Sequence, residues 1–374
     1  MGDNRKKFYV KTGKIDYVMV LIVMSMLCFG LVMLFSASAP KALNGGNAWG
    51  ALLKQSGVAA VGICCAAVIA KMDYRIFRNF AFPAMVVVTV LMYVVPFWGF
   101  ASHGATRQIE IGPINFQPSE VAKFALILFL ATWYSDERVN KLKKNLKHWI
   151  PLGVVFVQVI ACLLQSHLSA SLVILGIGAM LIIAAGLPQK AIIFFGAVAL
   201  GFLVVGGIFA ASYRMDRIEA LFFPFENMQG IGWQVVQSLL AVGSGGLFGL
   251  GLGQSRQKYN YLPEAQNDYI YAIICEELGF IGGVAVILLF VVFVLRGMAI
   301  AVNAEDRFGM FLAFGITSVI GLQMLINIGV VLSVLPSTGM QLPFFSEGGT
   351  SLFIMLLAVG VLLSVSKKSK IKKL

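Results

Sequence analysis

Long, nearly uncharged apolar segments recur along the chain and restrict what it can fold into. Of its 374 residues, 59% are hydrophobic and 12% are charged, with a mean hydropathy of +0.87. Soluble domains do not have such a composition. An α-helix needs about 20 apolar residues to cross a hydrocarbon core of roughly 30 Å. About ten candidate spans lie near residues 15–39, 48–70, 76–98, 119–134, 149–164, 168–186, 190–212, 269–295, 308–335 and 350–366.

These spans are predicted to be helices. A sheet edge in lipid leaves backbone polar groups unsatisfied, and no ten-residue alternating pattern repeats along the sequence. The first span is too long for a signal-peptide core and no small-residue cleavage pattern follows it, so we expect a retained anchor. The sequence predicts one all-α integral membrane domain over residues 1–374. All five cysteines fall within apolar spans, which indicates neither disulfides nor a metal site.

The distribution of basic residues predicts how the chain is oriented. The net charge is +12, and 21 of the 29 Lys and Arg residues fall in the termini and in alternate loops. Because positive charge accumulates in cytoplasmic loops, both termini are expected inside. The large loop between spans 7 and 8, residues 213–268, is then extracytoplasmic. The basic excess is a topology signal that also suits anionic headgroups, and we do not expect nucleic acid as a partner.

The loop before the fourth span and the start of that span carry three candidate residues. Arg107 lies in a turn-rich loop, and Gln-Pro-Ser-Glu begins the helix. Glu120 and Lys123 are three residues apart, so they share a helix face and can pair. A capped helix start with an internal ion pair explains this pattern without function. The cost of placing charges in a membrane favours a functional interpretation.

The extracytoplasmic loop and the start of the next span contain most of the remaining charge. Arg214 and Arg217 either sit at headgroup level in an interfacial helix or grip a phosphate. The segment GSGGLFGLGLG lacks the ending of a nucleotide-binding loop, so its glycines are interpreted as close packing or backbone approach to a ligand. Asp268 is either an N-cap or a tuned base. Other candidates are Arg256, Lys258, Glu264 and Glu276.

The last outer loop is expected to fold over the same pocket. Its prolines and glycines dictate an irregular backbone, which is tolerated at membrane depth only when buried in protein or lining a cavity. Its candidate residues are Asn327, Thr338 and Ser346. Lys54 is interpreted as a lysine that snorkels to the interface, and His167 as a hydrogen-bonded interfacial residue, without an assigned role for either.

Four motifs in order carry a family resemblance over essentially the whole chain. They are GATRQI with QPSEVAK, GWQVVQSLLAVGSGGLFGLGLGQSRQK, LPEAQNDYIYAIICEELG and NIGVVLSVLPSTGMQLPFFSEGGTS. Together they resemble the SEDS family (shape, elongation, division and sporulation). The residues of these motifs are more similar to the FtsW/SpoVE branch of the family than to RodA. The chain departs from the family in two places. Gln108 replaces the usual tryptophan, and SHLSAS replaces a frequent Pro-Asp-x-Gly-Thr pattern, so no family role transfers to His167.

The resemblance implies a peptidoglycan glycosyltransferase that polymerises lipid II on the outer face of the bacterial cytoplasmic membrane. It implies that Asp268, in the LPE-x-x-x-D segment, is the catalytic residue. It further implies a class B penicillin-binding protein as partner and a process of division, elongation or sporulation. One base suffices for this chemistry, because a lipid diphosphate is already a stable leaving group. Arg and Lys side chains on the outer side of the membrane would stabilise the charge of the departing diphosphate. A divalent cation (Mg²⁺ or Mn²⁺) is a possible addition to them. The outward candidates are Arg107, Lys123, Arg214, Arg217, Arg256 and Lys258.

Two other functions are compatible with the sequence. A flippase for the same lipid could use the intramembrane charges as a polar path. Against it, the charges cluster near the outer face and no inverted repeat of broken helices is visible. The other alternative is a non-catalytic scaffold for division or elongation proteins, in which replacing Asp268 would leave activity intact.

Overall fold

Helices make up most of the described chain. The computed structural model describes residues 13–186 apart from 41–47, 99, 103–104, 112–113, 137–138 and 140–143, residues 219–226 with isolated positions between 193 and 230, and residues 232–369. The α-helices are α1 (Tyr17–Ser38), α3 (Ala48–Lys71), α4 (Phe77–Trp98), α5 (Pro118–Ser135), α7 (Lys144–Leu164), α8 (Leu168–Ala184), α11 (Trp233–Ser244), α12 (Ile270–Val302), α13 (Arg307–Val331) and α14 (Gly349–Lys368), with a 3₁₀ turn, η1 (Tyr74–Ile76), before α4.

The protein is a multi-pass membrane protein. Within the described ranges, six helices are long and apolar enough to span a bilayer, namely α1, α3, α4 with η1, α12, α13 and α14. Helices α5, α7 and α8 coincide with three further predicted spans. The predicted span 190–212 lies outside the described residues apart from isolated positions. The number of membrane crossings and their sidedness therefore stay predictions.

Two helices extend five or more residues beyond the bounds that the hydropathy pattern predicted. Helix α12 continues to Val302 instead of residue 295, because Arg296 is accommodated by an ion pair of 2.8 Å with Asp16 before α1. Helix α7 begins at Lys144, five residues before the predicted start. The α12 extension starts with Arg296 and the α7 extension consists mainly of polar residues 144–148, so a search for uninterrupted apolar residues stops short of both.

A small sheet lies in the loop after α4, where only irregular turns were expected. Strands β1 (Phe100–Ser102), β2 (Ala105–Ile111) and β3 (Ile114–Phe116) pair antiparallel in the order β1-β2-β3. The predicted all-α fold class is confirmed for the described chain, and the sheet is a local feature of this loop that the sequence interpretation missed. The sheet does not contradict the argument about membrane strands, because its strands are too short to cross a bilayer.

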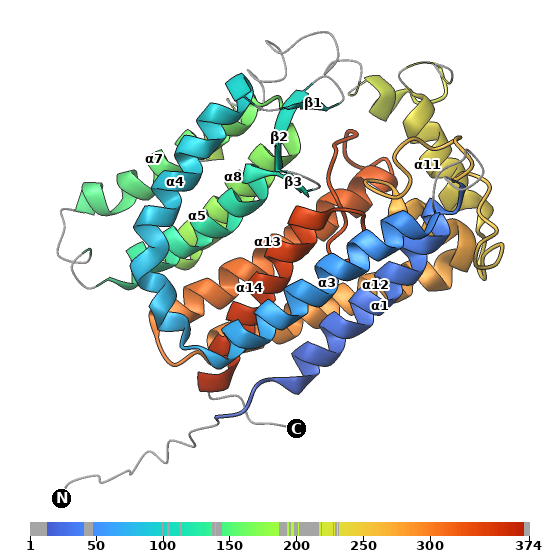
Figure 1. The fold of residues 1–374 in the computed structure, drawn as a ribbon. Coiled ribbons are helices and arrows are strands. Elements are labelled where there is room, and N and C mark those ends of the chain that lie inside the picture. The colour runs from blue at the N-terminus through green and yellow to red at the C-terminus, as the bar shows by residue number, and fades with distance from the viewer. Residues whose placement is uncertain are drawn as a thin grey trace, which may run out of the picture.

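The helices pack as two neighbouring groups. Helix α14 lies against α3, α1 lies against α12, and α12 packs on α13. On the other side, α4, α5, α7 and α8 form a second group, which joins the first through contacts of α13 with α5 and α8. The β-sheet and the loop between α13 and α14 lie together at one end of the molecule (Figure 1). This end contains the site.

Helix α12 is interrupted near its start, and the glycine-rich segment fills the interruption. Gly279 has φ 69° and ψ −166°, so the helical hydrogen bonds around it are broken. The carbonyls of Glu276 and Glu277 accept hydrogen bonds from the amides of Leu250 and Gly251, both at 3.0 Å. In return, the amide of Phe280 donates to the carbonyl of Gly246. The glycines thus allow close backbone approach, as one of the two sequence interpretations predicted.

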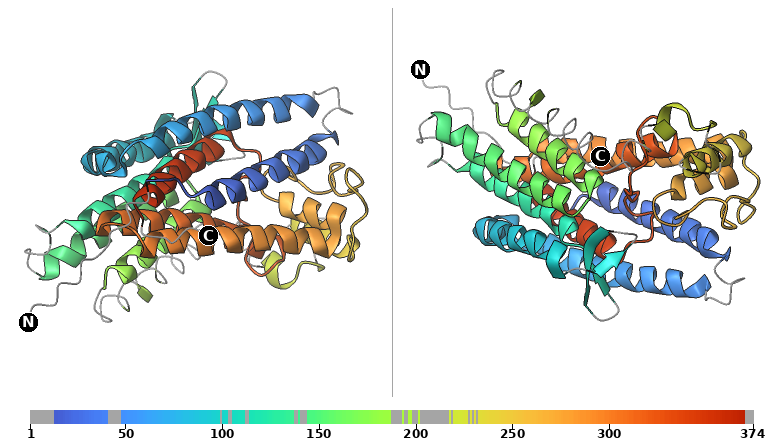
Figure 2. Two further views of the ribbon diagram at one scale, coloured as in Figure 1. Left: turned by 90° about the horizontal axis from the view of Figure 1, so that it is seen from below. Right: turned by 90° about the horizontal axis from the view of Figure 1, so that it is seen from above.

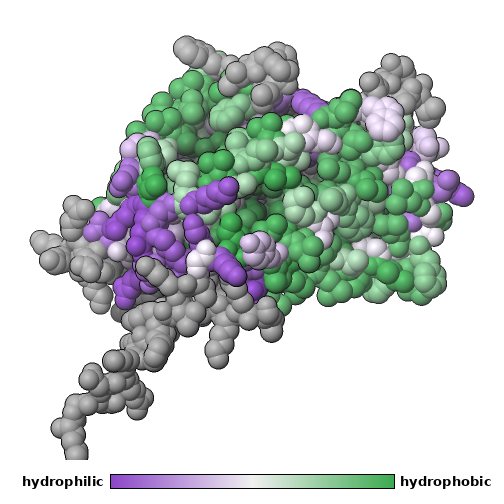
Figure 3. Space-filling view, turned by 60° about the horizontal axis from the view of Figure 1, so that its bottom comes forward, coloured by the Kyte–Doolittle hydropathy of each residue, from purple (hydrophilic) through white to green (hydrophobic). Residues whose placement is uncertain are grey.

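Ion pairs connect several segments at the opposite end of the molecule. Both termini of the described chain lie at this end (Figure 1). Asp73 pairs with Lys368, and Arg75 pairs with Asp306 at 2.8 Å and Glu305 at 3.1 Å. These contacts join the α3–α4 turn, the α12–α13 turn and the end of α14. Figure 3 shows hydrophilic side chains gathered at this end and a broad hydrophobic face beside them.

Candidate active site

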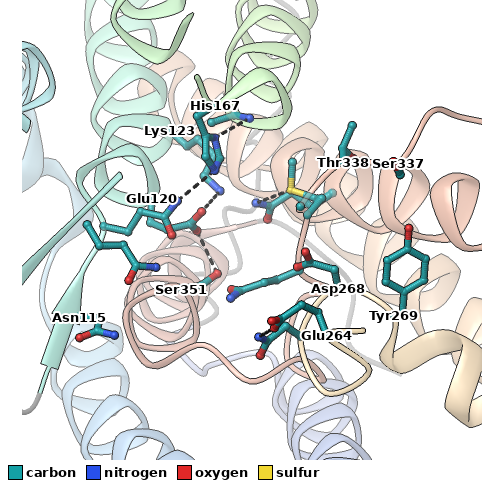
Figure 4. A pocket seen from close by; sticks show the side chains of 18 of the residues that line it. Asn115, Glu120, Lys123, His167, Glu264, Asp268, Tyr269, Ser337, Thr338 and Ser351 are labelled. Carbon is teal, nitrogen blue, oxygen red and sulfur yellow. Dashed lines mark hydrogen bonds and ion pairs between the residues drawn. The ribbon is translucent and has the colours of Figure 1, made fainter. Parts of the chain in front are cut away.

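A polar cavity of about 410 Å³ opens among the ends of five helices. Its walls come from the starts of α5, α8, α11, α12 and α14, from Gln323 within α13, from β2 and β3, and from the loop that follows α13. Glu120, Lys123 and His167 lie on one side of it, and Asp268 and Glu264 lie on the other (Figure 4). Segments separated by more than 200 residues in the sequence thus contribute to one polar site.

Asp268 is a half-buried residue directly before α12. The N-cap of α12 is Tyr269, whose side chain makes no capping hydrogen bond, so Asp268 is not the N-cap residue that the sequence offered as one interpretation. Asn327 in α13 donates to the backbone carbonyls of Asp268 at 2.7 Å and of Met340 at 2.6 Å. A Cβ atom on Gly339 would lie 3.2 Å from Asp268 Oδ2. The loop after α13 therefore passes directly beside the carboxylate, as expected for a loop folded over the pocket.

A buried ion pair faces the cavity from α5. Lys123 Nζ lies 2.6 Å from Glu120 Oε1, and the two side chains are 1% and 9% exposed. Ser351 at the start of α14 donates to Glu120 Oε2 at 2.9 Å. This confirms the predicted pairing at i,i+3. Because both groups also line the cavity, the structural and the functional interpretations hold together.

His167 caps α8 with its imidazole. Its Nδ1 accepts a hydrogen bond of 3.0 Å from the amide of Ala170, so Nδ1 carries no proton. Nε2 of the neutral ring then carries the proton. This nitrogen lies 3.2 Å from the side-chain amide of Gln117, whose oxygen can accept from it once the amide is oriented accordingly. His167 is hydrogen-bonded as expected, and it is buried and lines the cavity.

Three buried polar groups of the cavity wall have no hydrogen-bond partner within the described part of the chain. They are the hydroxyls of Tyr269 and Thr338 and the Oε1 atom of Gln323. Burial and the negative charge of Asp268 raise the pKa of Tyr269, while Arg217 acts in the opposite direction. Tyr269 therefore stays protonated and can donate. Such groups are available to a polar ligand, because an unpaired buried polar atom is costly.

A second polar cavity of about 540 Å³ adjoins the first. Lys54 on α3 lines it, with its side chain exposed to the cavity space, as do Gln266 and Glu347. The snorkelling interpretation of Lys54 misses this environment, because the cavity forms only when the loop after α13 packs beside α3.

The structure gathers six of the predicted site residues into the first cavity and leaves five described ones outside it. Inside are Glu120, Lys123, Arg217, Glu264, Asp268 and Thr338. Outside are Arg256, Lys258, Glu276, Asn327 and Ser346. Arg214 and the Arg107 side chain lie outside the described parts of the chain, although the backbone of residue 107 lies in β2. Arg217 donates to the carbonyl of Ser337, so it holds the loop after α13 at the cavity edge.

Lys258 and Glu276 belong to a buried network under the glycine-rich segment. Lys258 Nζ lies 2.8 Å from Glu277 Oε1, and Ser36 on α1 donates to the same carboxylate at 2.7 Å. Glu276 accepts a hydrogen bond from the amide of Arg256 at 2.9 Å. These charges are satisfied by one another and fix residues 253–258 onto α12. The sequence signalled buried charge correctly and did not reveal which charges face the cavity.

Ser346 and Asn327 are structural supports. Ser346 Oγ accepts from the amide of Leu342 at 2.8 Å, which closes a turn in the loop after α13. Asn327 donates to the backbone carbonyl of Asp268, so it fixes the backbone of the candidate base. Neither side chain lines the cavity.

The sequence interpretation missed most of the carboxamides that line the cavity. They are Gln108, Asn115, Gln117, Gln234, Asn267, Gln323 and Gln341. Neutral amides carry no charge signal in an apolar sequence. Asn115, Gln234, Gln323 and Gln341 each lie two residues after a glycine or a proline, which is a weak signal in a chain with many glycines. Carboxamides donate and accept hydrogen bonds, which suits sugar hydroxyl groups.

The side chains that could bind a metal ion are not clustered in the described part of the chain. No three His, Cys, Asp or Glu side chains among the described residues lie close enough together to hold an ion. The ligands that Mg²⁺ or Mn²⁺ would need are thus not assembled by those residues, and we derive no step through a metal.

Comparison with known proteins shows which family the chain belongs to. A family model described as "Cell cycle protein", covering FtsW, RodA and SpoVE, matches residues 17–371. The chain belongs to the FtsW/RodA/SpoVE family. It is 42% identical to stage V sporulation protein E of Bacillus subtilis over 95% of this chain and 98% of that protein. It is 39% identical to a probable peptidoglycan glycosyltransferase FtsW of Geobacter metallireducens over 99% of both chains.

Solved structures of this family share the fold. One, from work on polymerisation and crosslinking by a peptidoglycan synthase complex, matches with a TM-score of 0.77 and 28% identity, covering 94% of this chain and 97% of that one. RodA of Thermus thermophilus matches with a TM-score of 0.71 and 25% identity, covering 96% and 98%. The resemblance inferred from the four motifs is therefore confirmed, including its FtsW and SpoVE members.

Proposed function

We propose that this protein is a peptidoglycan glycosyltransferase that joins lipid II units into glycan strands at the outer face of the bacterial cytoplasmic membrane. The observation that carries the proposal is the cavity that brings Asp268 together with Lys123 and Arg217. Hydroxyl groups and an amide oxygen that have no partner among the described residues lie in the same cavity. Relatives named as peptidoglycan glycosyltransferases support the substrate class.

Asp268 serves as the general base in this proposal. It accepts the proton of the 4-hydroxyl of one lipid-linked disaccharide, and that oxygen bonds to the anomeric carbon of the other. The bond from this carbon to the lipid diphosphate breaks, and the diphosphate leaves as an anion. A general base of this kind contributes about 10²- to 10⁴-fold in rate. No second carboxylic acid is needed, because the leaving group is already a weak base.

Lys123 and Arg217 are the described cations of the same cavity and would face the departing diphosphate. Glu120 and Ser351 hold Lys123 in place. Glu264 has φ 53° and its side chain accepts from Asn267, which fixes the turn that ends at Asp268. Tyr269 and Thr338 would donate to sugar oxygens beside the base.

A partner follows from the structural relative obtained in a peptidoglycan synthase complex. We propose a single-span transpeptidase of class B penicillin-binding type, acting with division, elongation or sporulation proteins. The glycosyltransferase would make the strand and the partner would crosslink it.

Polymerisation of labelled lipid II by the purified protein in detergent tests the proposal. Glycan strands should form, alone or with the transpeptidase partner. If proteoliposomes instead move lipid II between leaflets and form no polymer under any partner condition, the flippase alternative replaces the proposal. In that case the intramembrane pair of Glu120 and Lys123 becomes part of a transport path.

A further inference from the structure

The two cavities share one wall, and this wall consists largely of carboxamides. Both cavities are lined by Gln108, Asn115, Gln117, Asn267, Gln341 and Ser351. Gln55 on α3 fixes the outer part of this arrangement by donating to the carbonyl of Ser346 at 3.0 Å and accepting from the amide of Gly348 at 3.3 Å. A neutral polar ligand such as a saccharide can therefore pass from one cavity into the other along hydrogen-bonding groups.

Lys54 is the cation of the second cavity that is available to a ligand. Within the described part of the chain it makes no hydrogen bond or ion pair, and its side chain is exposed. By contrast, Lys123 of the first cavity is paired with Glu120, and Arg217 donates to Ser337. Glu347, the one carboxylate among the described lining residues of the second cavity, has interactions of its own. An anionic group entering here meets an unpaired ammonium group.

The connectivity of the substrates decides which anion this is. In the donor, the diphosphate is bonded to the carbon under attack, so it must lie beside Asp268 in the first cavity. In the acceptor, two sugar rings separate the attacking 4-hydroxyl from the diphosphate. With its hydroxyl at Asp268, the acceptor must therefore extend out of the first cavity, and its diphosphate must bind elsewhere.

We propose that the second cavity is the acceptor site, an assignment that rests on the proposed function. The acceptor saccharide lies along the carboxamide wall, with its 4-hydroxyl at Asp268 and its diphosphate on Lys54. Lys54 then selects lipid-linked acceptors and takes no part in bond cleavage, while the cations of the first cavity act on the donor.

Substrates that can act only as donor or only as acceptor test this assignment. The donor is lipid II with a methylated 4-hydroxyl, which cannot accept. One acceptor is a lipid II analogue with a methylene group in place of the anomeric oxygen, which cannot donate, and the other is the same disaccharide as a methyl glycoside without diphosphate. The product of one coupling is measured by mass spectrometry for wild type, Lys54→Ala and the control Lys71→Ala, an exposed lysine at the far end of α3.

Lys54→Ala should raise KM for the diphosphate acceptor roughly 10- to 100-fold, as expected for lost charge-assisted hydrogen bonds to phosphate. It should leave kcat and the KM for the methyl glycoside unchanged, and Lys54→Arg should restore much of the loss. Lys71→Ala should behave as wild type with both acceptors. An equal effect of Lys54→Ala on both acceptors, or no effect on either, would overturn the acceptor assignment.

A binding measurement separates this assignment from the proposed function. In the non-reacting Asp268→Asn background, Lys54→Ala should weaken binding of the fluorescent diphosphate acceptor and leave donor binding unchanged. If wild type forms no coupled product and this selective loss is still seen, the Lys54 site stands and the glycosyltransferase proposal fails. If acceptor binding is unchanged by Lys54→Ala, the assignment of Lys54 is wrong whatever the catalytic result.

Discussion

At the scale of single residues, the site depends on polar side chains that hold one another in a largely apolar protein. Glu120 lies between Lys123 and Ser351, and Asn327 holds the carbonyl of Asp268. Removing one partner of a buried ion pair leaves an uncompensated charge, which costs far more than the pair contributes. The ion pair on α5 is thus a condition for keeping Lys123 at the cavity.

Glu120→Gln is expected to destabilise the protein by roughly 3 kcal/mol, because the 1%-exposed Lys123 loses its counter-charge. Thermal unfolding in detergent measures the change. The control Glu305→Gln removes an exposed partner of Arg75 and should cost less than about 0.5 kcal/mol. The double variant Glu120→Gln, Lys123→Met should recover much of the lost stability. Equal stability of Glu120→Gln and wild type would show that Lys123 does not depend on this carboxylate.

At the scale of elements, the sequence predicted the helices well and the arrangement of their ends poorly. Nine predicted spans coincide with described helices, because runs of apolar residues mark their positions even where, as in α5, α7 and α8, the run is short. The sheet after α4 and the break at Gly279 depend on loop pairing and on backbone hydrogen bonds between distant segments, which hydropathy does not encode. Asp268 was found through its motif, whereas the cavity carboxamides carry no such signal in a single sequence.

The glycine-rich segment gives a prediction at this scale. A Cβ on Gly249 would lie 2.1 Å from the carbonyl oxygen of Glu277, and its φ is +83°. The left-handed backbone alone costs about 1 to 2 kcal/mol for alanine, and the collision with backbone adds to it. Gly249→Ala should therefore lose more than about 2 kcal/mol of stability or fail to fold.

The control for this prediction is Gly243→Ala in α11, where an added Cβ meets no atom within 4 Å. In a helix, alanine is favoured over glycine by about 1 kcal/mol, so this variant should be at least as stable as wild type. Thermal unfolding of both variants makes the comparison. A tolerated Gly249→Ala variant would mean that the segment does not fill the break in α12.

At the scale of the whole molecule, the site lies at one end and a set of ion pairs closes the other. Partial burial would raise the pKa of Asp73, but the hydrogen bonds from Lys368 and from the Arg75 amide outweigh it and keep this pKa below its usual range. A carboxyl group with a lowered pKa in the folded state stabilises the protein above its unfolded pKa, which is about 3.9. This stabilisation is lost as the pH falls through the folded pKa.

Asp73→Asn should consequently lower the melting temperature at neutral pH, with a cost of about 0.2 to 1 kcal/mol typical of exposed pairs. The difference from wild type should shrink only below about pH 4, because the folded pKa lies below the unfolded one. Melting curves across acidic pH check the prediction. A difference that disappears near pH 6 would contradict the lowered pKa.

Asp268 is the base of glycan polymerisation in the proposed function, and every other role in the cavity depends on it. The most direct measurement is the polymerisation rate of labelled lipid II by wild type, Asp268→Asn and the neighbouring variant Glu264→Gln, with folding and lipid II binding measured in parallel. We expect Asp268→Asn to lose about 10²- to 10⁴-fold in rate while it still folds and binds, and Glu264→Gln to lose less. A folded Asp268→Asn protein that polymerises at the wild-type rate would contradict the account.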